Sequence, residues 1–201
     1  MKESRIRWKK ALKEFEQWYA RVGIKKRPLD WGWDWSLIEN FALQHMYKEE
    51  ICLDIGCGNG WFLIRVAKRG IKYGIGIDPS KTVIKDALVL KNSTDDKLDF
   101  IVAVGENLPL REEAVDAIVL LAVLDHVLSP TKVINEAHRV LKHNGRLIIY
   151  QSFSWHKRPL YSILWRLFRM FMRIPNATPT HTHSFSFKEL NSLLINNLFI
   201  D

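Results

Sequence analysis

Short apolar runs alternate with amphipathic segments along most of the 201-residue chain. Five of the runs are rich in β-branched residues, as buried strands are, and they cover residues 51–55, 73–77, 99–104, 115–123 and 145–153. The segments between them repeat apolar residues at helical spacing. Apolar strands joined through helices predict a parallel sheet that is covered on both faces. We therefore expect one α/β domain of the doubly wound type.

Residues with known helix-start and helix-stop preferences mark the ends of several of these helices. Ser80 and Ser129 stand where N-caps are expected. Pro130 occupies the first position of a helix that "HNG" (143–145) should end. A last helix is predicted over residues 187–197.

Two further helices are predicted ahead of the first strand, in an N-terminal cap over residues 1–48. The first helix places these apolar residues on one face: Trp8, Leu12, Phe15 and Tyr19. The second should begin at a capping box formed by Ser36 and Glu39 and run to about Met46. Helices in this position can cover the edge of the sheet or the mouth of a ligand site.

Three glycines follow the first strand in "LDIGCGNGW", at positions 56, 58 and 60. Their G-x-G-x-G spacing, with Trp61 next, departs from the G-x-G-x-x-G of dinucleotide sites, and no Gly-Lys-Ser/Thr follows as in a P-loop. Asp78 ends the second strand, where an acid can accept hydrogen bonds from both hydroxyls of a ribose. The loop and the acid together predict a site for an adenosyl ligand.

Five motifs resemble those of class I S-adenosylmethionine-dependent methyltransferases, specifically the methyltransferase type 11 group. They are "LDIGCGNG", "GIGIDPS", "GENLPL", "VDAIVLLAVLDHV" and "EAHRVLKHNGRLII", in this order over about residues 50–153. The resemblance implies a Rossmann-like domain over residues 49–201, with S-adenosyl-L-methionine as cofactor and S-adenosyl-L-homocysteine as product. It also implies a seven-stranded sheet that ends in a strand hairpin. The sequence stops at "LFID", where that hairpin should begin, so we expect either a shortened gene or a second copy or partner chain that covers the edge of the fifth strand.

The resemblance further implies nine cofactor-binding residues. Those after the first strand would lie under the methionine portion and the ribose, and the acid of the second strand would hold the ribose hydroxyls. The loop after the third strand would border the adenine, and the end of the fourth strand would contact the cofactor. In chain order the nine are Asp54, Gly56, Gly58, Gly60, Asp78, Gly105, Glu106, Asn107 and Leu121. Two positions depart from the family pattern: Val104 replaces an aspartate that binds the adenine amino group, and Leu121 replaces a small polar residue.

Candidate bases lie just after the fourth strand and near the end of the chain. Methyl transfer needs alignment and exclusion of water, and it needs a base only when the attacking atom carries a proton. We predict that His126 is this base, the alternative being that it only bonds backbone, and that Asp125 caps a turn. His181 and His183 form an H-x-H pair that lacks further ligands in register. We therefore expect them to position substrate or a loop, with no metal site.

Positive charge is concentrated in two segments that flank the glycine loop. The formal net charge is +8, with +7 in residues 1–27 and +5 in residues 151–187. The second segment holds a predicted lid, at about 154–184, in which arginines edge an apolar helix. Such a lid suits a hydrophobic or anionic small-molecule acceptor, which could be lipidic. The alternatives are RNA, with the tryptophans of "WGWDW" stacking on bases, and plain packing with a solvated basic surface.

The remaining features favour an intracellular enzyme. No apolar run approaches the ~20 residues of a membrane span, and the first ten residues lack the apolar stretch of a signal peptide, so we expect a cytoplasmic protein. Cys52 and Cys57 are expected to be reduced. We predict an S-adenosylmethionine-dependent methyltransferase that acts on a small molecule. The alternatives are an RNA (tRNA) methyltransferase and a non-catalytic regulatory subunit that binds S-adenosylmethionine.

Overall fold

The computed structural model describes residues 2–22, 33–91, 97–151 and 183–198. Its strands are β1 (Ile51–Ile55), β2 (Tyr73–Asp78), β3 (Leu98–Val102), β4 (Val115–Leu121) and β5 (Leu141–Tyr150). Its helices are α1 (Lys2–Val22), α2 (Trp33–Gln44), α3 (Trp61–Ala67), α4 (Lys81–Lys91), α5 (Pro130–Val140) and α7 (Phe187–Leu198). Most of the predicted lid, including its arginines, and His181 lie outside the described residues.

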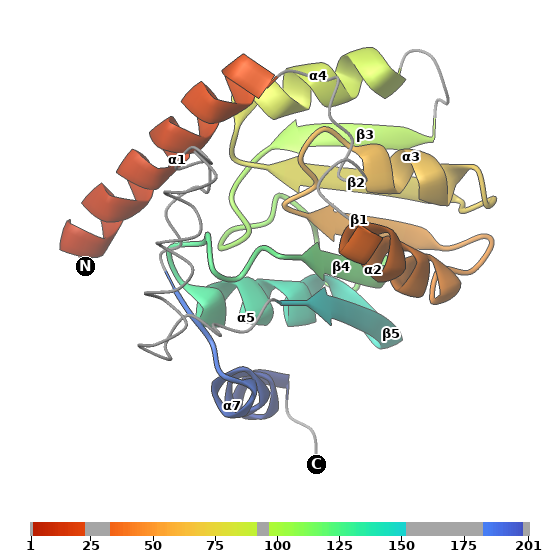
Figure 1. The fold of residues 1–201 in the computed structure, drawn as a ribbon. Helices are drawn as coiled ribbons and strands as arrows, with labels where there is room; N and C mark the ends of the chain where they lie inside the picture. Colours follow the sequence, from red (N-terminus) through yellow and green to blue (C-terminus); the bar gives the residue numbers. More distant parts are fainter. Residues whose placement is uncertain (1, 23–32, 92–96, 152–182, 199–201) are drawn as a thin grey trace.

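The five strands form one parallel sheet in the order β3-β2-β1-β4-β5 (Figure 1). The order reverses between β1 and β4, which places the expected ligand crevice at the carboxyl ends of these two strands. The predicted doubly wound α/β fold is therefore confirmed. In Figure 1 helix α1 lies beside the carboxyl ends of the strands, where Ser80 Oγ is 3.2 Å from Glu16 Oε1.

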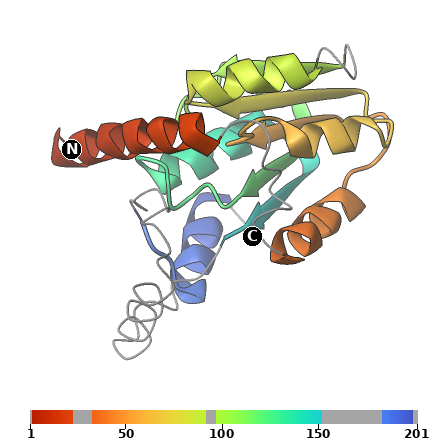
Figure 2. The same cartoon turned by 45° about the horizontal axis from the view of Figure 1, so that its top comes forward.

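Helices cover both faces of the sheet (Figures 1 and 2). One face packs against α2, α3 and α4, whose buried residues include Leu43, Leu63 and Ala87. The other face packs against α5 and α7. Because side chains alternate along a strand, neighbouring residues of β1 such as Cys52 and Leu53 enter opposite cores.

The capping box predicted for α2 is wrong, because this helix begins at Trp33, three residues before Ser36. Glu39 points into the protein, where it is only 3% exposed and pairs with Arg65 of α3. Glu39, which the local pattern assigned to a helix cap, therefore forms a long-range ion pair instead. By contrast, Ser80 caps α4 as predicted, since its Oγ accepts a hydrogen bond from the Val83 N–H at 3.4 Å.

The sequence "HNG" was expected to end α5 and separate it from β5. In the structure these three residues lie inside β5. The strand begins at Leu141, directly after the helix, and its pairing with β4 shifts register between Val115 and Ala117. Asn144 has a φ of 60° within this irregularity. The turn residues therefore form a bulge, which lets helix and strand follow each other without a loop.

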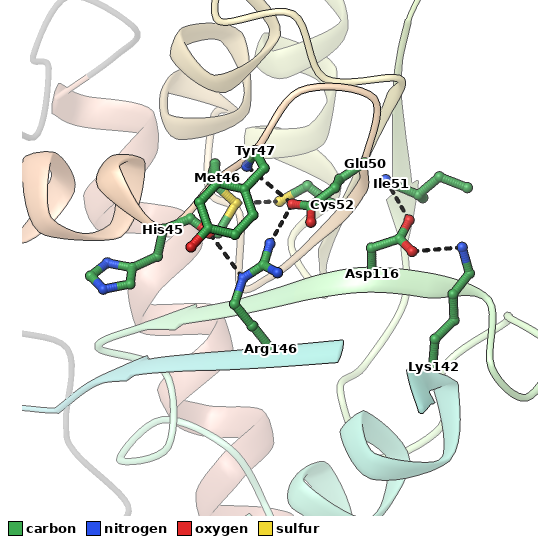
Figure 3. A network of polar contacts seen from close by, with 9 residues as sticks. All are labelled: His45, Met46, Tyr47, Glu50, Ile51, Cys52, Asp116, Lys142 and Arg146. Atoms are coloured by element: carbon green, nitrogen blue, oxygen red, sulfur yellow. Dashed lines mark hydrogen bonds and ion pairs between the residues drawn. The ribbon is translucent and has the colours of Figure 1, made fainter. Parts of the chain in front are cut away.

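A network of polar contacts ties α2 and the amino ends of three strands together. Its members, drawn in Figure 3, are His45, Met46, Tyr47, Glu50, Ile51, Cys52, Asp116, Lys142 and Arg146. Arg146 of β5 pairs with Glu50, donates to the backbone oxygen of His45 at 3.2 Å and lies 4.1 Å from the Tyr47 ring centre. Asp116 of β4 accepts hydrogen bonds from the first N–H of β1 and from a lysine of β5. The network therefore holds together the amino ends of these strands, and the ligand crevice lies at the opposite, carboxyl ends.

Two features of the fold concern possible partners: the outer side of β5 and the apolar character of the helices. Within the described residues β5 pairs only with β4, so its other side is the edge at which a covering chain was expected. Among the described helices, none combines the length and the apolar character that a membrane crossing requires.

Candidate functional site

The glycine loop connects β1 to α3 and is fixed against the end of β2. The N–H groups of Gly56 and Cys57 donate to the backbone oxygen of Ile77 at 2.7 and 3.1 Å. A Cβ at Gly56 would lie 2.5 Å from Val123, whereas a Cβ at Gly58 would meet no atom within 4 Å. Packing therefore requires glycine at position 56. At position 58 the backbone faces open space, as a surface that receives a ligand must.

Asp78 lies at the end of β2, directly against this loop. Its Oδ2 accepts a hydrogen bond from the Gly58 N–H at 3.1 Å, and its Oδ1 accepts one from the Ser80 N–H at 2.9 Å. Burial raises the pKa of this carboxyl to about 6, although the two N–H bonds oppose the shift. A carboxylate has about four lone-pair sites, so both oxygens can accept further hydrogen bonds, for example from two neighbouring hydroxyls.

Asp54, in β1, is the second buried carboxyl of the site, with an exposed fraction of 3%. Burial raises its pKa to about 8, and the negative charges of Asp78 and Glu39 add to the shift. Carboxylates that repel one another in a buried site are relieved by a bound cation. An adenosyl sulfonium, which carries hydroxyls and positive charge, therefore fits the open loop, the free lone pairs of Asp78 and the excess of acid.

These raised pKa values predict how the stability of the protein without cofactor depends on pH. Both carboxyls bind a proton more tightly in the folded state than in the unfolded state, where their pKa is near 3.8. The free energy of unfolding should therefore fall as pH rises above about 4, by up to about 1.4 kcal/mol per pH unit for each group, until pH reaches about 6 for Asp78 and about 8 for Asp54. Urea unfolding at several pH values measures this slope.

A matched pair of variants isolates the contribution of Asp54. Asp54→Asn should flatten the slope between pH 6 and 8. Asp99→Asn should leave it unchanged there, because the Tyr73 hydroxyl lowers the pKa of Asp99. Equal slopes in the wild type and in Asp54→Asn would show that the Asp54 carboxyl does not titrate in this range.

The loop after β3 contains the residues that were predicted to border the adenine. Gly105 is buried, Asn107 is exposed and Val104 is half-buried. Glu106 also has a role that the sequence did not reveal. Its Oε1 accepts hydrogen bonds from the N–H groups of Leu128 and Ser129, at 2.7 and 3.1 Å. This carboxylate caps the start of α5, where Ser129 itself makes no side-chain cap.

The loop after β4 holds the predicted base. Asp125 is buried, with an exposed fraction of 4%, and its Oδ1 lies 3.7 Å from Nε2 of His126, whose side chain is 36% exposed. Ala122, just ahead of them, has a φ of 56°, which is rare for a residue other than glycine and is typical of functional turns. Among the described residues no three potential ligands gather as a metal site would require.

His183 meets the same loop from the other end of the chain. Its N–H donates to the backbone oxygen of Asp125 at 3.1 Å, and its Nε2 donates to that of Leu128 at 3.3 Å. Nε2 of this ring therefore carries a hydrogen, because a backbone oxygen can only accept. These two bonds agree with the predicted positioning of a loop.

An apolar pocket of about 310 Å³ lies between α2 and the ends of β4 and β5. Its lining consists of Leu37, Ile38, Phe41, Ala42, Leu121, Ile148, Ile149 and Tyr150. Leu37 and Phe41 are more than half exposed, although both are large and apolar. Helix α2 belongs to the N-terminal cap, whose helices were expected to cover the edge of the sheet or the mouth of a ligand site, and Leu121 was expected to contact the cofactor. The sequence signal for this lining is the apolar residues that α2 carries on more than one face.

Comparisons with known proteins agree with this geometry. Residues 53–149 match the family model of the methyltransferase domain. A tRNA U34 carboxymethyltransferase of Saccharophagus degradans is 31% identical over 122 residues, which are 60% of this chain and 36% of that protein. The chain thus corresponds to little more than a third of this relative.

Two solved structures share the fold. The YcgJ protein of Bacillus subtilis superposes with a TM-score of 0.67 at 21% identity, over 81% of this chain and 68% of that one. A SAM-dependent methyltransferase of Methanosarcina mazei gives 0.63 at 24% identity, over 78% of this chain and 82% of that one. The motifs, the sheet order and these matches lead to one assignment: residues 53–149 match the methyltransferase domain family.

Proposed function

We propose that this protein transfers the methyl group of S-adenosylmethionine to a small acceptor with an apolar body, held in the pocket between α2 and β5. The observation that carries the proposal is the apolar lining of this pocket at the carboxyl ends of β4 and β5. A volume of about 310 Å³ lies in the range of small-molecule sites. Four of the lining residues come from α2, in the part of the chain that was predicted to cap the domain.

The strand order supports a position for the acceptor beyond β4. The glycine loop follows β1 and Asp78 ends β2, so a ligand held by both lies on the β1 side of β4. The pocket lies on the β5 side, and Leu121 at the end of β4 forms part of its wall. Donor and acceptor would therefore meet above the end of β4.

The chemistry asks little of the protein beyond alignment. S-Adenosylmethionine supplies a methyl group whose bond to sulfur breaks, with the electron pair remaining on sulfur, as the bond to the acceptor forms. The apolar wall of the pocket excludes water, and the acids of β1 and β2 hold a cationic donor. His126 would take the proton that an acceptor hydroxyl or amine loses.

A label-transfer experiment tests the proposal. The protein is incubated with S-adenosylmethionine labelled in its methyl group, in parallel with an organic extract of bacterial cells and with total bacterial tRNA. We expect label in organic-soluble products. Label in the tRNA alone would refute the small acceptor, and label in neither fraction would favour the non-catalytic alternative.

A charged wall should block the pocket. Leu37→Glu places a carboxylate at an exposed position of the lining, so it should reduce label transfer at least tenfold and leave cofactor affinity within about twofold. Gln44→Glu is the matched control, because it adds the same charge to an exposed position at the end of α2, outside the lining. Equal loss in both variants would mean that charge on α2 matters and the pocket does not.

A second candidate function is the methylation of tRNA. The observation that favours a tRNA acceptor is the name shared by several curated relatives, tRNA U34 carboxymethyltransferase, although that name denotes the transfer of a carboxymethyl group. The net charge of +8 is compatible with an RNA partner. The tRNA arm of the label-transfer experiment decides between the two candidates.

A further inference from the structure

Glu16, in the second half of α1, contacts the turn between β2 and α4. Its Oε1 accepts a hydrogen bond from the Ser80 hydroxyl at 3.2 Å, across 64 positions of the chain. The hydroxyl oxygen itself accepts a hydrogen bond from the Val83 N–H, so its hydrogen is available to the carboxylate. Ser80 is fully buried. The carboxylate of Glu16 is therefore held at the carboxyl end of the sheet.

The same turn connects Glu16 to Asp78, the acid that is expected to hold the ribose. The Ser80 N–H donates to Asp78 Oδ1 at 2.9 Å, while the Ser80 hydroxyl donates to Glu16. The two carboxylates are close enough for the charge of Glu16 to raise the pKa of Asp78. Among the described residues, no cation contributes to the shift of this pKa. Two neighbouring acids without a cation favour a ligand that brings hydrogen-bond donors or positive charge.

Helix α1 lies beside the carboxyl ends of the strands, with its C-terminal end next to the start of α4 (Figure 1). Of the residues of α1 whose side chains the structure describes, only Ala11 is buried. Few buried apolar contacts therefore hold this helix on the domain. A ligand bound between the helix and the end of β2 would add to its attachment.

The contact of Glu16 lies toward the adenosine end of the expected cofactor. Ser80 leads into α4, and this helix packs over β2 and β3. The glycine loop and Asp54 belong to β1, on the other side of β2. Glu16 is thus on the side of Asp78 that faces the loop after β3, where the adenine was predicted, and away from the expected methionine part.

We infer that Glu16 is a cofactor-binding residue, which accepts a hydrogen bond from the adenosine part of S-adenosylmethionine beside Asp78 and so closes α1 over the cofactor. The Ser80 hydroxyl occupies one of the roughly four lone-pair sites of the Glu16 carboxylate, and the others can accept. Adenosine offers two ribose hydroxyls and an amino group as donors. The inference goes beyond the proposed function, because it concerns the cofactor and holds for either candidate acceptor.

Two ligands that share the adenosine part test the inference. Methylthioadenosine lacks the amino acid and the positive charge of S-adenosylmethionine. Calorimetry on the full chain gives Kd for both ligands. Glu16→Ala should weaken both by the same factor, about tenfold, because each loses a hydrogen bond to a charged group. Glu16→Gln keeps an acceptor oxygen without the charge, so its loss should be smaller.

Glu14→Ala is the matched control on the same helix. Glu14 lies two positions before Glu16, so the two side chains point in different directions, and it pairs with Lys10 at 3.9 Å. Its removal should leave both values of Kd within about twofold of the wild type. Thermal unfolding without cofactor shows whether each variant is folded, and Glu16→Gln serves in both measurements if Glu16→Ala is not.

Hydrogen exchange of α1 provides a second readout. A contact that α1 lends to the cofactor must stabilise the bound helix by the same factor, because linkage is reciprocal. Saturation with S-adenosylhomocysteine should therefore slow exchange of the amides of residues 14–18 by about tenfold in the wild type and in Glu14→Ala. In Glu16→Ala the cofactor should slow it much less. A residue that only ties α1 to Ser80 would not produce this difference.

Three outcomes would overturn the inference: unchanged Kd for both ligands in a folded Glu16 variant, a loss confined to S-adenosylmethionine, or exchange in α1 that does not respond to the cofactor. The second would mean that Glu16 acts on the charged methionine part. Failure of the proposed function has a different signature. In that case the wild type transfers no label to the organic fraction, while both ligands and the exchange of α1 still respond to Glu16→Ala.

Discussion

Asp78→Ala is expected to weaken the binding of S-adenosylmethionine by about 1.5 to 3 kcal/mol, or about 10- to 150-fold in Kd. The carboxylate accepts hydrogen bonds from the N–H groups of Gly58 and Ser80, and we expect its remaining lone pairs to accept hydrogen bonds from the ribose hydroxyls. Its removal would take away both the contact and the support of the loop. Isothermal titration calorimetry with S-adenosylmethionine and with S-adenosylhomocysteine measures the change.

The control for this variant is Asp86→Ala, which removes a half-buried acid from the adjoining helix α4. It should leave Kd within about twofold. Thermal unfolding without cofactor shows whether the loop variant is still folded. Unchanged affinity in folded Asp78→Ala protein would contradict the assignment of the ribose to this acid.

His126→Ala is expected to lower the rate of methyl transfer by about 10²- to 10⁴-fold while cofactor affinity stays within about twofold. The reason is the position of this histidine after β4, half exposed and 3.7 Å from a buried carboxyl that can orient it. The rate is measured by label transfer to the acceptor fraction identified above, at saturating S-adenosylmethionine. Added imidazole should restore part of the lost rate.

His143→Ala serves as its control, since that histidine is exposed in the bulge of β5, near the amino edge of the sheet. A full rate in His126→Ala protein would assign this residue to the structure of the loop. The same result would follow if the attacking atom of the acceptor carries no proton. The pH dependence of the wild-type rate separates these two cases. If His126 is structural and another group is the base, the rate follows the titration of that group; if the attacking atom carries no proton, no base titrates in the rate.

The sheet and the glycine loop could be predicted because their signals are local. A five-residue strand with four apolar residues, a turn with three glycines and an acid at the next strand end each lie within a few positions, and the structure contains all of them. The order of the strands then follows from the rules for parallel sheets.

The features that sequence reasoning missed depend on residues far apart in the chain. Glu39 appeared to be a helix cap until its contact with Arg65, 26 residues away, took precedence. Glu106 caps α5 across 22 positions, and no local pattern in either segment shows this. The contact of Glu16 with Ser80, across 64 positions, is likewise visible only once both elements are in place.

The polar network around Arg146 has a consequence for how such a protein can diversify. It anchors the domain at the amino ends of the strands, while the apolar pocket, His126 and His183 lie at their carboxyl ends. Substitutions that reshape substrate choice therefore need not touch the residues that keep the domain folded. Evolution or protein engineering could replace the pocket residues of α2 and keep the domain fold, provided that the polar network around Arg146 is preserved.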